Sequence, residues 1–401
     1  MIDKTVVISQ NICDEVEHAI DGISPDKVFV LYDSTTRECC SPLLEGCRSL
    51  QNATAIQIPA TDVNKTLDTL SAVWMELSNG GASRRSLLIN VGGGMVTDLG
   101  GFAASTFKRG IAYINIPTTL LAMVDASVGG KTAINFNGLK NEVGVFNAPA
   151  RVIVDTQFLR TLDIKNMLSG YAEMIKHGLI SNTGVWADIM NFDMGRADYG
   201  ALQKMVADSI DVKAAIVAND PKENGLRKAL NVGHTAGHAI ESLALMENRP
   251  VLHGYAVAWG MVCELYLSRV KKGFPQGEMH QTIRYIKENY GTFDFGCDKY
   301  EKLYSLMQHD KKNVGGVINF TLLSGIGRIE LDCTADKDEI FAMDTVMQFT
   351  VYGDDTLLKD AQDVIADIEN KASVTNPDSE LYAINRDGSG VLTGRAAEIQ
   401  L

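Results

Sequence analysis

Short β-rich runs alternate with helical segments through the first 160 residues, and this alternation restricts the possible folds more than any other feature. Runs rich in Val, Ile, Leu and aromatic residues cover 27–32, 55–58, 86–91, 112–116 and 152–154. Stretches with helical periodicity, such as 66–77, lie between them. Parallel strands need long crossover connections, usually helices, so the alternation predicts an α/β domain with a parallel sheet.

From about residue 160 the pattern changes to long segments with the helical period. These segments cover 164–179, 199–218, 233–244, 255–270 and 281–288. They predict a mostly helical second domain, which ends in a β-hairpin over 317–323 and 328–331. A third segment begins near residue 342 with a predicted strand over 345–352 and an amphipathic helix over 356–371.

Composition excludes several classes of protein. The chain has 401 residues, 45% of them hydrophobic and 22% charged, as globular proteins do. A net charge of −13 argues against binding to nucleic acid. There is no run of ~20 apolar residues and no apolar leader, so we expect no membrane span and a cytoplasmic location. Seven cysteines without a CxxC pair predict reduced thiols.

A glycine-rich turn follows the third β-rich run. Gly92, Gly93 and Gly94 lie between a strand and a helix of small residues, where backbone N–H groups can approach a pyrophosphate. A merely tight strand–helix turn would explain the same glycines. The later segment 124–132 ends in GGKT, but Asp125 occupies the place of the first glycine of a phosphate loop. With Arg109, Lys140 and Asn141 nearby in the sequence, the segment predicts a site for an anionic ligand.

A group of histidines and one glutamate predicts a metal site. His234 and His238 lie four residues apart on one helical face, and His253 follows in the next segment. Glu173 and Lys176 lie in an apolar helix, and a buried carboxylate needs a partner or a metal ion. Three N and O ligands with open positions are typical of catalytic zinc, and His238 would remain for proton transfer. An amphipathic helix with two ordinary histidines is the alternative.

Several long motifs together resemble the 3-dehydroquinate synthase family over residues 1–340. They are GGGMVTDLGGFAAST, KRG, IPTTLLAMVDASVGGKTAIN, LKNEVGVF, AEMIKHGLI, NVGHTAGHAIE, HGYAVAWGM and HDKKN. The resemblance implies a Rossmann-like NAD-binding domain over 1–158 and a helical metal and substrate domain over 159–340. It also implies a homodimer that acts in the shikimate pathway of aromatic amino acid and chorismate biosynthesis.

The family's reaction implies the cofactors NAD and Zn²⁺, with Co²⁺ as a second possible metal. A lyase of this family converts 3-deoxy-D-arabino-heptulosonate 7-phosphate, a phosphorylated sugar acid, to 3-dehydroquinate and phosphate. The sequence of steps is transient oxidation by NAD, phosphate elimination, reduction and intramolecular aldol closure. NAD therefore acts as a catalyst and remains bound.

The resemblance also carries residue roles onto matching positions of this sequence. The implied metal ligands are Glu173, His234 and His253. The implied NAD contacts are Asp33, Lys65, Gly93, Gly94, Asp98, Thr118, Thr119, Lys140, Phe158 and Thr161. The implied substrate contacts are Arg109, Asp125, Lys131, Asn141, Lys176, Lys213, Arg227, Asn231, His238 and Lys311. Glu223 and His238 match positions for proton transfer, and Lys176 and Asn141 join them as implied catalytic residues.

Some positions depart from the family pattern, and some alternatives remain. Asp62 replaces the usual glutamate near Lys65, and Leu139 replaces a glycine. Another sugar-phosphate cyclase or a metal-dependent polyol dehydrogenase would share much of the pattern.

Residues 341–401 resemble the N-terminal part of a flavin (FMN) transferase domain and are predicted to be an incomplete extension. Because the downstream metal-binding segments of that family are absent, we expect no flavin transfer.

Overall fold

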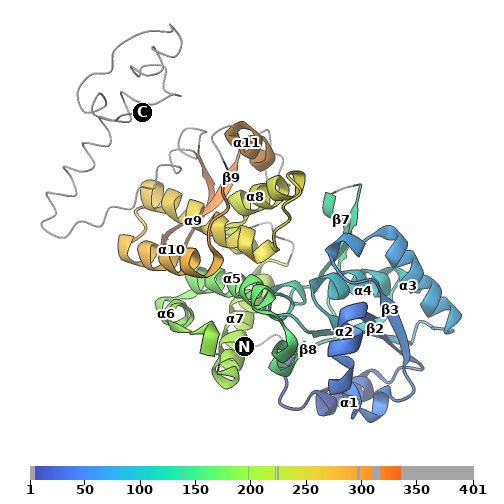
Figure 1. The fold of residues 1–401 in the computed structure, drawn as a ribbon. Coiled ribbons are helices and arrows are strands. Elements are labelled where there is room, and N and C mark those ends of the chain that lie inside the picture. Colours follow the sequence, from blue (N-terminus) through green and yellow to red (C-terminus); the bar gives the residue numbers. More distant parts are fainter. Residues whose placement is uncertain are drawn as a thin grey trace, which may run out of the picture. The chain divides into compact units, whose positions relative to one another are not determined.

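A computed structural model of the chain describes residues 5–137, 139–196, 198–221, 223, 225–295, 299–308 and 317–335 (Figure 1). All of these described residues belong to one compact unit. The predicted Lys311 contact and the predicted extension over 341–401 lie outside the described residues. The predicted boundary at 158/159 stays a prediction. Below, the sheet region means residues 5–162 and the helical region means the described residues from 163 onward.

The sheet region is built on one parallel sheet of six strands, as the alternating pattern predicts. In spatial order the strands are β1 (Val6–Ile8), β8 (Arg151–Val154), β5 (Ala112–Pro117), β4 (Leu87–Gly92), β2 (Val28–Asp33) and β3 (Thr54–Ile58). Every pairing is parallel, and the register brings Gly92 opposite Pro117. The carboxyl ends of all six strands therefore lie along one edge.

Both faces of this sheet are covered, which explains its nearly continuous apolar strands. Phe29 and Leu31 of β2 pack with α3 (Leu67–Asn79) and α4 (Gly94–Thr106). Val30 and Tyr32 face the opposite side, where α1 (Ile12–Ile23) packs. That second core continues into the helical region, so the two regions share buried apolar contacts.

The helical region contains the long helices that the 3.6-residue period predicts. They are α5 (Ile164–Ser181), α6 (Thr183–Asn191), α7 (Tyr199–Asn219), α8 (His234–Met246), α9 (His253–Lys272), α10 (Gln276–Tyr290) and α11 (Tyr300–Gln308). The predicted hairpin is present as β9 (Asn319–Gly325) and β10 (Arg328–Thr334). Within the described residues, no helix combines the length and apolar character needed to cross a membrane. The predicted α/β plus α architecture is confirmed.

Some elements are not evident from the sequence. The short elements are α2 (Ser34–Cys39), η1 (Ser41–Leu44), η2 (Arg48–Leu50), η3 (Asp62–Asn64), η4 (Phe107–Arg109), the π-helical turn η5 (Ala122–Ala126), η6 (Thr156–Thr161), η7 (Met194–Arg196) and η8 (Leu226–Asn231). An antiparallel ribbon of β6 (Lys131–Phe136) and β7 (Leu139–Phe146) also forms. All of β7 is exposed, so it has no buried face to set the alternation that identifies strands.

The cysteine prediction is wrong for one pair. Cys13 of α1 and Cys47 form a disulfide that spans 34 residues, whereas reduced thiols were expected throughout. Distance in sequence concealed the pair, since only the fold of α1 over the segment after α2 brings the two residues together. Cys39, Cys40 and Cys333 are free thiols, and Cys297 lies outside the described residues.

Glycines set the distance between α9 and its neighbouring helices. A Cβ on Gly254 would lie 1.9 Å from the carbonyl oxygen of Ser169 in α5. A Cβ on Gly260 would lie 2.0 Å from the carbonyl oxygen of Gly233, the residue before α8. Both contacts are with backbone atoms, which cannot rotate away as a side chain can. Only glycine at these positions permits the observed packing of α9 on α5 and α8.

Replacing Gly254 with alanine should therefore destabilise the fold. We expect Gly254→Ala to lower the free energy of unfolding by about 1–3 kcal/mol or more, because an extra methyl group in a tightly packed contact forces the backbone apart. Urea denaturation followed by circular dichroism measures the change. Gly277→Ala in α10 is the control, since a Cβ there would meet nothing within 4 Å. Equal midpoints for Gly254→Ala and the parent would contradict the proposed close approach.

Candidate functional site

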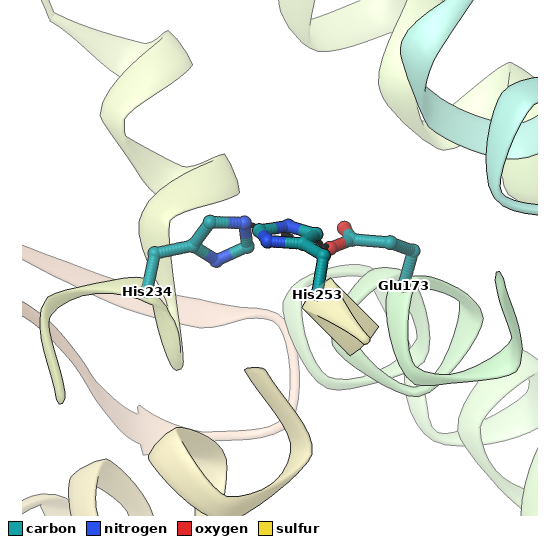
Figure 2. A group of neighbouring side chains, drawn as sticks. All are labelled: Glu173, His234 and His253. Carbon is teal, nitrogen blue, oxygen red and sulfur yellow. Dashed lines mark ion pairs between the residues drawn. The ribbon is translucent and has the colours of Figure 1, made fainter. Parts of the chain in front are cut away.

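Three side chains from three different helices converge in the helical region (Figure 2). Glu173 lies in α5, while His234 and His253 are the first residues of α8 and α9. Glu173 Oε1 lies 3.5 Å from His234 Nε2 and 3.6 Å from His253 Nε2. One ligand atom from each residue lies within 4.8 Å of the others, a spacing that one metal ion could bridge.

The other nitrogen of each histidine ring has a hydrogen-bond partner. His234 Nδ1 lies 3.1 Å from the carbonyl oxygen of Val232, and His253 Nδ1 lies 3.2 Å from a carboxylate oxygen of Glu241. A neutral imidazole that donates from Nδ1 carries its lone pair on Nε2. Both rings therefore present Nε2 to Glu173, which is how a histidine ligand is usually oriented.

The carboxylate of Glu173 fits a bound cation. Its side chain is fully buried, and neither oxygen accepts a hydrogen bond within the described residues, although Lys176 forms an ion pair with Oε2. Burial alone would raise the pKa of Glu173, but Lys176, His234 and His253 hold it well below its usual range. An ionised, buried carboxylate without hydrogen bonds is costly, and a divalent cation would satisfy its oxygens.

Protonation of His253 makes metal binding at this group depend on pH. Burial alone would lower its pKa, but the neighbouring carboxylates of Glu173 and Glu241 raise the pKa of His253 to about 10. In the metal-free protein this ring is therefore protonated at neutral pH. A metal ion would have to displace that proton, so metal binding should release a proton from this site.

Two buried lysines lie beside the same group. Lys213 Nζ of α7 donates to Asp125 Oδ1 at 2.6 Å, and Lys176 Nζ lies 3.9 Å from the same oxygen. Burial alone would raise the pKa of Asp125, but the two lysines lower it. Burial is also the main cause that lowers the pKa of Lys213. Two buried cations at one place are suited to an anionic ligand.

A second charged cluster surrounds Glu223. Lys131 of β6 forms an ion pair with its carboxylate, and Asn231 Nδ2 donates to Oε1 at 3.2 Å. Arg227 lies nearby in η8, is buried, and donates to the carbonyl oxygen of Gly129 at 3.4 Å. Burial lowers the pKa of Arg227. This cluster joins the two regions, since Lys131 and Gly129 belong to the sheet region.

The predicted NAD contacts of the sheet region gather at the carboxyl ends of its strands. Asp33 ends β2, Gly93 and Gly94 follow β4, and Thr118 and Thr119 follow β5. Phe158 and Thr161 lie in η6, just after β8. In open α/β sheets this edge is where dinucleotides bind.

The turn after β4 fits a phosphate group. Gly93 is the N-cap of α4 and has no side chain to satisfy the first N–H groups of the helix. A Cβ at Gly93 would lie 3.0 Å from Thr119 Cγ2, so the turn also lies close to the end of β5. A helix N-terminus without a side-chain cap is a favourable place for an anion.

Lys65 lies in the middle of a polar cluster at the same edge. This lysine is buried, and its ammonium donates to Asp98 at 3.0 Å and to Asn141 Oδ1 at 2.6 Å. Burial alone would lower the pKa of Lys65, but Asp98 and Asp62 raise it. Burial raises the pKa of Asp98. The cluster connects α4, η3 and the β6–β7 ribbon.

Three predicted site residues have left-handed backbone conformations. The φ angles are 70° for Arg109, 53° for Asn141 and 62° for Glu223. For residues other than glycine, this conformation costs about 1–2 kcal/mol. Strained backbone of this kind is concentrated at functional sites.

The structure does not bring every predicted residue together. Arg109 is exposed, and its described contacts include no other predicted site residue. The His238 ring lies 5.3 Å from the ring of His234 and 5.9 Å from that of His253, between centroids, yet His238 is not part of the three-ligand group. Lys311 lies outside the described residues, so its role stays a prediction.

Two glutamates near the site were not predicted. Glu264 of α9 is buried, and its carboxylate accepts the backbone N–H groups of Gly233, Thr235 and Ala236, so it holds the start of α8 at His234. Its partners are backbone groups distant in sequence, and such contacts produce no recognisable pattern of residue types in the sequence. Glu241 does have a signal, because it lies seven residues after His234 and thus on the same helical face.

His177 is a further buried titratable group. Its Nδ1 lies 2.6 Å from Ser209 Oγ, and its Nε2 has no hydrogen-bond partner in the described residues. Burial, assisted by the charge of Lys176, lowers the pKa of His177 to about 3. With Asp125 and Glu173, His177 forms a second group whose ligand atoms lie within 4.8 Å of one another.

Comparison with known proteins identifies the family of this chain. Residues 55–169 match the family described as 3-dehydroquinate synthase N-terminal, and residues 170–313 match 3-dehydroquinate synthase C-terminal. The chain is 53% identical over 340 residues to the 3-dehydroquinate synthase of Parabacteroides distasonis, covering 85% of this chain and 96% of that protein. It is 39% identical over 315 residues to that of Leptospira interrogans, covering 78% and 86%.

Solved structures share the fold at lower sequence identity. A 2-deoxy-scyllo-inosose synthase, in complex with carbaglucose-6-phosphate, NAD⁺ and Co²⁺, has a TM-score of 0.73 at 24% identity and covers 84% of this chain and 95% of its own. The 2-epi-5-epi-valiolone synthase of Streptomyces hygroscopicus, with NAD⁺ and Zn²⁺ bound, has a TM-score of 0.73 at 23% identity, covering 86% and 96%. The chain thus shares the fold of these two synthases. By its family matches and its curated relatives, the chain belongs to the 3-dehydroquinate synthase family.

The depressed pKa of His177 predicts a pH-dependent stability. The unfolded chain binds a proton near the ordinary pKa of 6.5, whereas the folded chain resists it until about 3. Stability is therefore lost as the pH falls from 6.5 towards 3. Between pH 7.5 and 5.5, His177 should cost the metal-free protein about 1.4 kcal/mol of unfolding free energy.

Urea denaturation of the metal-free protein at pH 7.5 and 5.5 measures this loss. The variant His177→Gln should lose about 1.4 kcal/mol less than the parent between the two pH values. His280→Gln, which changes an exposed histidine of α10, should behave as the parent does. Equal losses for His177→Gln and the parent would contradict burial of a neutral His177.

Proposed function

We propose that this chain is a carbon–oxygen lyase that converts 3-deoxy-D-arabino-heptulosonate 7-phosphate to 3-dehydroquinate and phosphate, with NAD and one divalent metal ion, Zn²⁺ or Co²⁺. Membership of the 3-dehydroquinate synthase family supports the reaction. The single observation that carries the site is the fully buried Glu173 carboxylate, which faces Nε2 of His234 and Nε2 of His253.

Glu173, His234 and His253 would hold the metal ion, and the other positions of the ion would remain open to the substrate. A bound metal ion would polarise a substrate hydroxyl and stabilise its developing negative charge. The neighbouring His238, half-buried beside both histidine ligands, would exchange protons with the substrate. Its role requires that it remains outside the metal ligands.

The carboxyl ends of the strands would hold NAD. The proposed contacts are Asp33, Lys65, Gly93, Gly94, Asp98, Thr118, Thr119, Lys140, Phe158 and Thr161. Bound NAD would accept a hydride from a substrate alcohol and later return it, so the reaction has no net redox change. The N–H groups at the start of α4 would face the pyrophosphate, and buried Lys65 would fix the loop through Asp98.

Lysine and arginine side chains would hold the anionic groups of the substrate. The proposed contacts are Arg109, Asp125, Lys131, Asn141, Lys176, Lys213, Arg227, Asn231, His238 and Lys311. Lys176 and Lys213 converge on Asp125 from two helices, so the substrate would meet cations already fixed in position. Glu223 would move a proton, because Lys131 and Asn231 keep its carboxylate directed toward the same cluster.

Phosphate release from the heptulosonate phosphate tests the proposed reaction. Chelator-treated protein with NAD should release little phosphate, and Zn²⁺ or Co²⁺ should restore the rate. Glu173→Gln should reduce the rate by about 100-fold or more, since a bound metal ion contributes several kcal/mol to the stability of the transition state. Glu247→Gln, which changes an exposed ion pair at the end of α8, is the control. The proposal is wrong if the parent with NAD and Zn²⁺ releases no phosphate.

The chain is also proposed to form a homodimer. The whole of β7 is exposed and includes the apolar residues Leu139, Val143, Val145 and Phe146. An exposed strand edge with apolar side chains is a typical surface for pairing with a second copy. The β6–β7 ribbon is therefore the proposed contact.

Light scattering after size-exclusion chromatography tests the dimer. The parent should have twice the mass of one chain, and the double variant Val143→Asp, Val145→Asp should shift to the mass of one chain because it introduces charge into the contact. Val270→Asp in α9 is the control, since Val270 is also an exposed apolar residue outside the ribbon. A parent with the mass of one chain would exclude the dimer, and a dimeric double variant would exclude this contact.

A further inference from the structure

Glu241 lies between a proposed metal ligand and a proposed NAD contact. It is on α8, seven residues after His234 and so on the same helical face. One carboxylate oxygen, Oε2, lies 3.2 Å from His253 Nδ1. The other, Oε1, accepts a hydrogen bond from Lys140 Nζ of β7 at 2.6 Å. One carboxylate thus contacts both the helical region and the β6–β7 ribbon.

We propose that Glu241 is a positioning residue that orients His253 for the metal ion and, through Lys140, couples metal binding to NAD binding. The inference rests on the proposed function, because it takes His253 as a metal ligand and Lys140 as a cofactor contact. Glu241 itself touches neither the substrate nor the reacting atoms in this arrangement.

The hydrogen bond to Glu241 determines which nitrogen of His253 faces the metal site. In the neutral ring, donation from Nδ1 to the carboxylate leaves the lone pair on Nε2, which lies 3.6 Å from Glu173. His234 is oriented instead by a backbone carbonyl oxygen, which a side-chain substitution cannot remove. His253 is therefore the ligand whose orientation depends on one replaceable side chain. Loss of such a partner typically lowers metal affinity 10- to 100-fold.

Alternating charges continue from Glu241 to the proposed NAD contacts. Lys140 Nζ lies 3.4 Å from Asp62, and Asp62 lies 3.5 Å from Lys65 Nζ. Lys65 in turn donates to Asp98 of α4 at 3.0 Å. Three proposed NAD contacts, Lys140, Lys65 and Asp98, therefore share a network of ion pairs with the proposed metal site.

This network gives metal and cofactor a physical route to influence each other. A metal ion at His253 changes the charge that Glu241 faces, and Glu241 in turn holds the Lys140 ammonium that is proposed to contact NAD. Coupling between two binding sites is reciprocal, so NAD must alter metal affinity by the same factor. Because the Lys140 side chain is about half exposed, at 51%, water weakens its ion pair. We therefore expect a factor of about 5–10, at the low end of the usual range.

Cobalt titration of the whole metal-free protein tests this inference. Co²⁺ is added with and without saturating NAD, and calorimetry gives its affinity while visible absorption reports its coordination. Glu241→Gln keeps a hydrogen-bond acceptor but removes the charge, and we expect about 10-fold weaker Co²⁺ binding. Glu241→Ala removes both, and we expect a 10- to 100-fold loss with an altered absorption spectrum. Glu247→Gln, at the C-cap of the same helix, is the control and should match the parent.

The coupling is tested by the ratio of Co²⁺ affinities with and without NAD. This ratio should be about 5–10 in the parent and in Glu247→Gln, and should approach 1 in Glu241→Gln. Unchanged Co²⁺ affinity and spectrum in both Glu241 variants would overturn the positioning role. An equal ratio in the parent and in Glu241→Gln would overturn the coupling. A parent that binds no Co²⁺ would instead overturn the proposed metal site, and this inference with it.

Discussion

Close backbone contact between α9 and its neighbours α5 and α8 is the constraint on which the site depends. Gly254 and Gly260 allow this approach, because a Cβ at either position would fall within 2.0 Å of a carbonyl oxygen. The three proposed metal ligands come from these three helices. Ligand distances in metal sites tolerate only about 0.2 Å, so the spacing of the helices decides whether the ligands can meet at one ion. The packing distance between these helices therefore determines the geometry of the proposed metal site.

Buried charge is the second constraint, and it is better explained by ligand binding than by stability. Buried Glu173, Lys176 and Lys213 alternate in sign with the partly buried Asp125. Buried ion pairs often contribute no more stability than well-packed apolar residues would, because both charges must be removed from water. What such an array does provide is fixed charges that need no rearrangement when a cation and an anion bind. Glu173 contacts a lysine and two histidines, and Asp125 contacts two lysines, so both carboxylates are already held in place for ligand binding.

The sequence predicted the features that repeat along the chain and missed those formed by distant partners. Hydrophobic periods located β2, β4 and β5 and the long helices α5, α7 and α9, since burial imposes those periods. Histidine spacing and an apolar helix around Glu173 indicated the metal group. Glu264 was missed because it binds backbone N–H groups 28 to 31 residues away. The Cys13–Cys47 disulfide and the exposed ribbon were missed because neither leaves a periodic pattern.

The fold alone does not distinguish a cyclase from a dehydrogenase. A butanol dehydrogenase of Thermotoga maritima shares it with a TM-score of 0.60 at 14% identity. Folds carry many reactions, and side chains at the site decide among them. A dehydrogenase acting on an uncharged alcohol needs no cations beyond those for its cofactor and metal, whereas elimination of phosphate from a sugar acid requires further cations to hold two anionic groups. Lys176 and Lys213 beside Asp125, together with Lys131 and Arg227 near Glu223, are the cations proposed for this purpose.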